Sequence, residues 1–250
     1  MALAALCFLA GNASLFGGPE SSGQAPLTPT PQIAGEMRRV MREGHLAGVL
    51  DLRTIRSHVG LYGVGPVEYL KGELTIFDGV SYKSTVTADR RIHVEKTFEA
   101  KAPFFVYANV TNWVEAPLPE TVLSLKDLET FLDRATTNHS RPFAFKVKAD
   151  IASAEIHVLN LPEGGSVHSH EEGHRGQLLS AIEPGAVDLV GFFSTEHQGI
   201  FTHHDSYIHV HLLTEDRAQI GHLNSVTFKP GSARLFLPKD DRQSGAAASL

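Results

Sequence analysis

Cysteine is nearly absent from this chain of 250 residues, in which Cys7 stands alone. A single thiol excludes an internal disulfide framework, and it also excludes the thiolate-rich sites that hold structural zinc. Any metal ion bound by this chain must therefore be held by histidine, aspartate or glutamate. Histidine is abundant, with 14 copies.

Clusters of positive charge and long apolar runs are also missing. The net charge is -6, whereas nucleic acids and anionic membranes select for clustered lysine and arginine. The apolar run over residues 2–10 is too short for a transmembrane helix. Apolar residues make up 42% of the chain and charged residues 20%, which is ordinary for a globular protein. These features favour a small molecule as the partner.

The two ends of the chain differ in composition from the middle. Residues 2–10, followed by small residues up to Ala13, resemble a secretory signal peptide, although no lysine or arginine precedes Arg38. We therefore interpret residues 1–31 as a signal-like leader and a flexible linker. The leader predicts export to the periplasm or the extracellular space; if it is only a disordered segment, the protein is cytoplasmic. Residues 239–250 are predicted to be a disordered tail.

Two stretches have the apolar spacing of amphipathic helices. Residues 33–42 show this spacing and end before Gly44, a natural stop. The first helix is expected to serve packing and not chemistry. Residues 125–137 show the same spacing after Ser124, which is suited to cap the first turn.

A two-residue hairpin is predicted where Asp78-Gly79 separates two alternating runs. This hairpin places Glu73 on a strand, with its side chain on the same face as Thr75. A carboxylate in the middle of a strand is more often a solvated edge residue, so Glu73 alone indicates little.

Alternation continues in the second half of the chain. Residues 141–161 predict two strands, and Glu155 and His157 share a face of the second one. Residues 187–193 predict a buried strand. A closing hairpin is expected around Pro230-Gly231.

A strand with two histidines, followed by a turn and a third histidine, occupies residues 206–222. His209 and His211 alternate with apolar residues, so both imidazoles lie on one face of the strand. If residues 215–221 fold back as a hairpin-like loop, His222 comes up beside that pair. Three protein ligands with a position left open are typical of a catalytic zinc site. The alternative is a chance His-x-His pattern in a histidine-rich chain.

A second histidine-rich stretch covers residues 163–174. Its glycines and the pair His168-x-His170 resemble the first metal motif of a cupin barrel, but Glu172 follows too closely. His174 falls where a later ligand could stand. The many polar residues and glycines favour an exposed loop, either solvated or gating a substrate, over a metal site.

These motifs together resemble the α-acetolactate decarboxylase family over about residues 48–228. The resemblance is carried by residues 61–65, 72–74, 78–79, 142–143, 189–192, 209–217 and 221–222. It implies that His209, His211 and His222 hold a Zn2+ ion and that Glu73 reaches the metal site. It also implies conversion of 2-acetolactate to acetoin with loss of carbon dioxide, and a homodimer.

The fold class implied by the resemblance is α+β and sheet-dominated, with two packed mixed or antiparallel sheet regions and few helices. The strands predicted above agree with it. We expect residues 32–140 to form an N-terminal α/β sheet region, and residues 141–238 to form a C-terminal β region that carries the histidine site.

The sequence departs from the family at two points. His157 aligns with a family arginine that binds the substrate carboxylate or delivers a proton, and the chain turns polar at Lys239 where the family has a further glutamate. An imidazole cannot copy a permanently charged guanidinium, but it can donate a proton near neutral pH. We therefore name Glu73 and His157 as candidate catalytic residues acting on a 2-hydroxy-3-keto acid. The alternative is a non-catalytic exported protein that binds a metal or ligand, on the same or a cupin-like scaffold.

Overall fold

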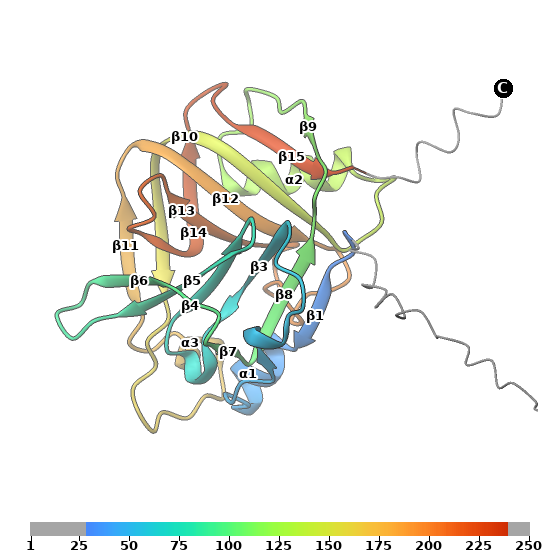
Figure 1. Ribbon diagram of the computed structural model, residues 1–250. Helices are drawn as coiled ribbons and strands as arrows, with labels where there is room; N and C mark the ends of the chain where they lie inside the picture. Colours follow the sequence, from blue (N-terminus) through green and yellow to red (C-terminus); the bar gives the residue numbers. More distant parts are fainter. Residues whose placement is uncertain (1–28, 240–250) are drawn as a thin grey trace, which may run out of the picture.

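The computed structural model describes residues 29–239 (Figure 1). The signal-like leader, Cys7 and the predicted tail beyond Lys239 lie outside these residues, so the expectations about them remain predictions. None of the helices between residues 29 and 239 combines the length and the apolar character needed to cross a membrane.

One antiparallel sheet of six strands comes from the first half of the chain. Its order is β1-β8-β3-β4-β5-β6. The strands are β1 (Gln32–Gly35), β3 (Leu61–Pro66), β4 (Glu73–Phe77), β5 (Val80–Val86), β6 (Ile92–Lys96) and β8 (Phe104–Asn109). Two short strands, β2 (Leu50–Asp51) and β7 (Lys101–Ala102), pair separately. The predicted hairpin is confirmed, because Phe77 pairs with Val80 across two residues that both have positive φ.

A second sheet of seven strands contains the rest. Its members are β9 (Trp113–Ala116), β10 (Phe143–Val158), β11 (Leu178–Ile182), β12 (Gly185–Phe193), β13 (Ile208–Thr214), β14 (Ile220–Phe228) and β15 (Arg234–Pro238). The path β12-β13-β14-β10 closes on itself, because β10 also pairs with β12. The expected sheet-dominated α+β fold is thereby confirmed. β9 precedes residue 140, the predicted boundary between regions, yet it pairs with β15 in this second sheet.

The long strand β10 corrects two predictions. Residues 143–158 form one strand, not two, because register shifts after Ile151 and after Glu155 let it bend without losing its partners. The predicted hairpin around Pro230-Gly231 is also wrong. β14 and β15 both pair with β10, through Ile151 to Phe228 and Lys146 to Phe236, and not with each other.

Within residues 29–239, three α-helices and two 3-10 turns accompany the sheets. The helices are α1 (Met37–Glu43), α2 (Leu125–Ala135) and α3 (His170–Gly173), and the turns are η1 (Leu52–Thr54) and η2 (Glu68–Leu70). The helix predicted from residue 33 begins only at Met37, because residues 32–35 pair with β8 as a strand. Ser124 caps α2 as predicted, its hydroxyl accepting from Asp127 N–H.

The two sheets pack face to face, and the layer between them positions the functional residues (Figure 1). Tyr62 and Val106 from the first sheet meet Phe192 and Leu213 from the second in one buried cluster. On the opposite face of β13, Val210 points into a separate core within the second sheet. Helix α2 covers this core and contributes Leu128 to it. Polar side chains that point between the sheets are therefore screened from water on both sides.

Candidate metal centre

Strands β13 and β14 bring three histidines together. His209 and His211 lie on the β13 face that looks toward the first sheet, and both side chains are buried. His222 is the cross-strand partner of His211 on β14 and is partly exposed. The three residues can each offer a ring nitrogen such that all three nitrogens lie within 4.8 Å of one another. The structure thus assembles all three of the predicted ligands.

The turn between these strands sets their register. The Thr214 hydroxyl donates to Asp216 over 2.7 Å and accepts from Gln219 N–H over 3.1 Å. Arg217 takes the left-handed conformation, and its guanidinium donates to the Asp188 carboxylate on β12 over 2.5 Å. A one-residue slip would turn His222 to the other face of the sheet, so these contacts protect the site geometry.

The first sheet contributes two polar side chains to the same point. Glu73 on β4 is 2% exposed, and its Oε2 lies 3.7 Å from His211 Nε2. Two residues along the same strand, the fully buried Thr75 places its hydroxyl 2.7 Å from His211 Nδ1. Glu73 is therefore a buried residue at the sheet interface and not a solvated edge residue. Thr75 shares the predicted face, but sequence reasoning gave it no role.

Burial between the sheets dominates the electrostatics of the site. Desolvation raises the pKa of the Glu73 carboxyl well above its usual value, while a hydrogen bond from Leu159 N–H opposes this. Desolvation lowers the pKa of His209 to about 3 and holds the pKa values of His211 and His222 well below the ordinary histidine value. The three histidines are neutral at pH 7, which is the form that binds a metal ion.

His157 on β10 completes the inner wall of the site. It faces His222 across the strand pair, with ring centroids 4.6 Å apart. Its Nδ1 lies 2.6 Å from Asn224 Oδ1, and Asn224 in turn donates to Glu155 over 3.0 Å. We assign the His157 proton to Nδ1 on this network, which leaves Nε2 as an acceptor 3.9 Å from Glu73 Oε1.

The charge of His157 differs from what the sequence indicates. Burial, with a smaller contribution from His174, lowers the pKa of His157 to about 3. The side chain is therefore neutral at pH 7, and the expectation that it donates a proton as an imidazolium near neutral pH is not supported. The sequence could not indicate this burial of His157, because it comes from the packed sheets and from a loop that is distant in the chain.

The donor set fits a transition-metal ion. Among residues 29–239, His209 Nδ1 and His211 Nε2 are buried ring nitrogens without a hydrogen-bond partner. The other nitrogen of His211 is held by Thr75, and the backbone of Phe201 hydrogen-bonds the His209 ring. Metal-binding histidines are commonly held in this way through their second nitrogen. Three imidazoles and a nearby carboxylate suit Zn2+ among other metals.

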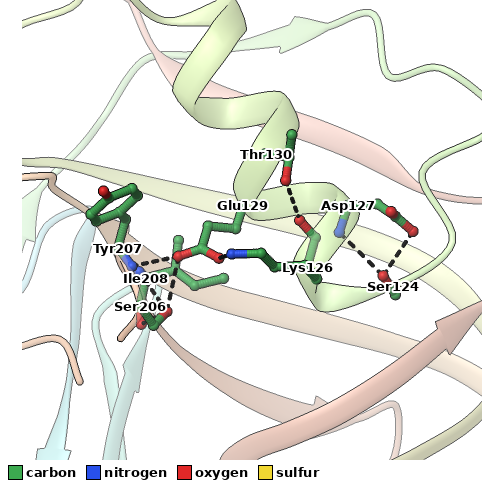
Figure 2. Close-up of polar contacts among 8 residues, drawn as sticks. All are labelled: Ser124, Lys126, Asp127, Glu129, Thr130, Ser206, Tyr207 and Ile208. Atoms are coloured by element: carbon green, nitrogen blue, oxygen red, sulfur yellow. Dashed lines mark hydrogen bonds and ion pairs between the residues drawn. The ribbon is translucent and has the colours of Figure 1, made fainter. Parts of the chain in front are cut away.

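A carboxylate on α2 fixes the segment that leads into β13 (Figure 2). Glu129 is 5% exposed and accepts from Tyr207 N–H over 2.5 Å, from the Ser206 hydroxyl over 3.2 Å and from Lys126 over 2.7 Å. Figure 2 shows these donors converging on one carboxylate. Sequence reasoning missed this residue, whose only signal is an acidic side chain on the apolar side of a helix.

The second histidine-rich stretch lies against the first site. The predicted exposed loop contains the helical turn α3, from which His174 reaches within 5.0 Å of His157 between ring centroids. His203, from the segment before β13, lies 5.2 Å from His222 on the same measure. Burial lowers the pKa values of His170 and His203 to about 4 each. The exposed His168 forms no part of this contact; its N–H donates to Glu172.

A small cavity opens on the exposed side of the triad. Its volume is about 250 Å³, and its lining includes His203, Ser206, His222 and Asn224. The cavity gives a small molecule access to His222 from solvent. The larger hollow of about 910 Å³, beside Tyr69 and Lys71, contains none of the triad.

Comparisons with known proteins found a family model, a curated relative and solved structures that are similar to this chain. The family model described as Alpha-acetolactate decarboxylase matches residues 36–238. An alpha-acetolactate decarboxylase of Methanosarcina mazei is 26% identical over 238 residues, which cover 90% of this chain and 79% of the relative. The crystal structure of alpha-acetolactate decarboxylase from Bacillus subtilis strain 168 superposes with a TM-score of 0.67 at 18% identity, covering 84% of this chain and 86% of that one. A Staphylococcus aureus protein of unknown function, described as similar to alpha-acetolactate decarboxylase, gives 0.64 at 17% identity, with 84% and 85% covered. The two structural likenesses establish the fold.

Proposed function

The chain belongs to the alpha-acetolactate decarboxylase family, and on this premise we propose that it is a zinc-dependent decarboxylase of 2-acetolactate, or of a related 2-hydroxy-3-keto acid. The products are acetoin and carbon dioxide. The observation that carries the proposal is the convergence of His209, His211 and His222 on one point, with the Glu73 carboxylate beside them.

The reaction needs a place for negative charge and a source of one proton. The bond between the carboxylate carbon and C2 breaks, its electron pair forms an enolate with the neighbouring ketone, and a proton then reaches C2. When bound to His209, His211 and His222, a Zn2+ ion supplies the positive charge that stabilises the developing enolate oxygen. The sheets exclude water from this point, since His211 is fully buried.

Glu73 is the residue placed to move the proton. Its two oxygens face His211 and His157 at 3.7 and 3.9 Å, and among the residues described here it is the carboxylate closest to the triad. A carboxyl group in this position holds a proton at Oε and delivers it to C2. Leu159 N–H, 3.4 Å from Oε1, keeps the group oriented.

His157 orients the substrate and Glu73 without carrying charge. Asn224 fixes its tautomer, so Nε2 accepts a hydrogen bond from the substrate hydroxyl or from the Glu73 acid proton. The family resemblance places an arginine at this position. A neutral imidazole binds a carboxylate less strongly than a guanidinium does, so we expect a high KM for 2-acetolactate.

The experiment is an assay of carbon dioxide and acetoin from racemic 2-acetolactate, with the protein loaded with zinc and, in parallel, stripped by a chelator. The proposal predicts activity only in the loaded form, and loss of activity in Glu73→Gln with zinc content unchanged. A zinc-replete wild-type protein that releases neither product refutes it.

The non-catalytic alternative rests on the replaced arginine, and metal analysis separates it. A metal-binding protein built on the outer loop keeps all its zinc in His209→Ala and loses zinc in His168→Ala, whereas the proposed enzyme loses the triad ion in His209→Ala and no zinc in His168→Ala. The expected homodimer is checked by light scattering on the same samples.

A further inference from the structure

We propose that His170, His174 and His203 form a second transition-metal site, next to the triad and outside it. The three residues have no part in the proposed reaction, and the site does not depend on that activity. His170 begins α3, His174 is the C-cap residue after it, and His203 lies in the segment before β13. The ligand class is a divalent ion that prefers imidazole, such as Zn2+ or Co2+.

The first observation is the spacing on α3. His170 and His174 are separated by one helical turn, and their rings stack with centroids 4.2 Å apart. The residues from 170 to 174 read His-Glu-Glu-Gly-His, the His-Glu-x-x-His spacing that places two zinc ligands on one helix face. Ser169 caps the turn by accepting from Glu172 N–H, so the turn that presents the pair is anchored.

The second observation is the ring nitrogen that His174 leaves free. His174 Nδ1 lies 2.8 Å from the carbonyl oxygen of His170. A carbonyl only accepts, so Nδ1 carries the proton and Nε2 keeps its lone pair.

The third observation is the pair of nitrogens that already meet. His170 Nε2 and His203 Nδ1 lie 3.0 Å apart. Zinc–nitrogen bonds of about 2.0–2.1 Å at a tetrahedral angle put two nitrogens about 3.3 Å apart. The pair therefore needs to open by only a few tenths of an ångström to exchange its shared proton for an ion. His174 supplies the third nitrogen only after its ring turns and releases the His170 carbonyl, since among residues 29–239 the structure brings three such nitrogens within 4.8 Å of one another at the triad alone.

The surroundings suit an exchangeable ion. His168, His204 and Arg38 line a cavity of about 390 Å³ together with His170 and His203, so water or a small anion can complete the coordination. His203 contacts both His170 and His222, with ring centroids 5.0 and 5.2 Å apart. The outer site thus lies one imidazole away from the triad.

The test is the number of metal ions bound by the full chain. Metal-free protein is dialysed against buffer containing excess Zn2+, in parallel against Co2+, and then analysed for metal content. We expect two ions per chain in the wild type and one in His170→Ala, His203→Ala and His174→Gln. His211→Ala is expected to retain one ion, which is the outer one. One ion in the wild type overturns the proposal.

The matched control is His93→Ala, because His93 is exposed on β6 and far from α3 in the sequence. This control variant should keep both ions. If it loses one, or if His170→Ala and His203→Ala both still bind two, the second ion binds elsewhere. Circular dichroism checks that each variant folds. If one does not, anomalous scattering from a zinc-soaked wild-type crystal decides between a peak at His170 and His203 and no peak there. Failure of this test leaves the decarboxylase assay unaffected, since the triad is measured separately.

Discussion

Replacing Thr75 by valine removes one hydrogen bond from the metal centre and almost no volume. The Thr75 hydroxyl is 2.7 Å from His211 Nδ1, and both side chains are fully buried. If His211 binds the metal through Nε2, its Nδ1–H donates to Thr75. Valine leaves that N–H unpaired between two sheets where no water replaces the lost partner.

The structure sets the size of the expected effect. Leaving a buried donor unpaired costs about 1–3 kcal/mol, so metal-free Thr75→Val should lose that much unfolding free energy. Loss of a residue that supports a metal ligand typically lowers metal affinity about 10–100-fold, which corresponds to about 1.4–2.8 kcal/mol of binding free energy. The affinity falls for a separate reason, because valine no longer holds the His211 ring in the orientation that the ion needs.

The assay is competition for zinc with a chromogenic chelator, alongside urea unfolding of the metal-free protein. Thr75→Ser is the control, since it keeps the hydroxyl and loses only a methyl group, at about 1 kcal/mol of stability. The Thr75→Ser variant should therefore bind zinc as tightly as the wild type, whereas the Thr75→Val variant should bind it less tightly. If valine binds zinc as tightly as the wild type, Thr75 does not orient His211 and the assigned tautomer is wrong.

Three further predictions concern the rest of the site. Glu129→Ala should lower the unfolding free energy by about 2–3 kcal/mol in urea, because Tyr207 N–H loses a charged acceptor, whereas Glu129→Gln, which still accepts, should lose less. In the folded metal-free protein the pKa of His157 is about 3, so this side chain stays neutral at pH values where His157 of the unfolded chain binds a proton, below about pH 6.5. Stability should therefore fall as the pH drops from 6.5 toward 3, by up to about 1.4 kcal/mol per pH unit for this group, and a urea-unfolding series in His157→Gln should show a shallower slope. Zinc at about 1,000 times its Kd should raise the unfolding free energy by about 4 kcal/mol in the wild type and by less in His211→Ala; equal increases would show that the triad is not the main site.

Local patterns carried most of the successful predictions. Alternation placed His209 and His211 on one face, and the Asp78-Gly79 turn put Glu73 on a strand, because side-chain direction in a strand depends only on local geometry. Local patterns gave the wrong prediction for β10, because a bend within one strand looks like the end of a strand in the sequence. They were also wrong for residues 33–35, which have helical spacing but pair with β8 as a strand.

The sequence by itself indicated the kind of site: with one cysteine, the histidines at 209, 211 and 222 predict an imidazole-based metal centre, and the motifs around them indicate the family. Only the tertiary structure decided what surrounds it. The packing of β4 against β13 buries Glu73 and joins Thr75 to His211, although 136 residues separate the last two. The assembled fold also buries His157, which makes that side chain neutral, and it places α3 beside the triad. Burial and charge state are properties of the assembled sheets, because desolvation depends on every element packed around a group and not on its neighbours in the chain.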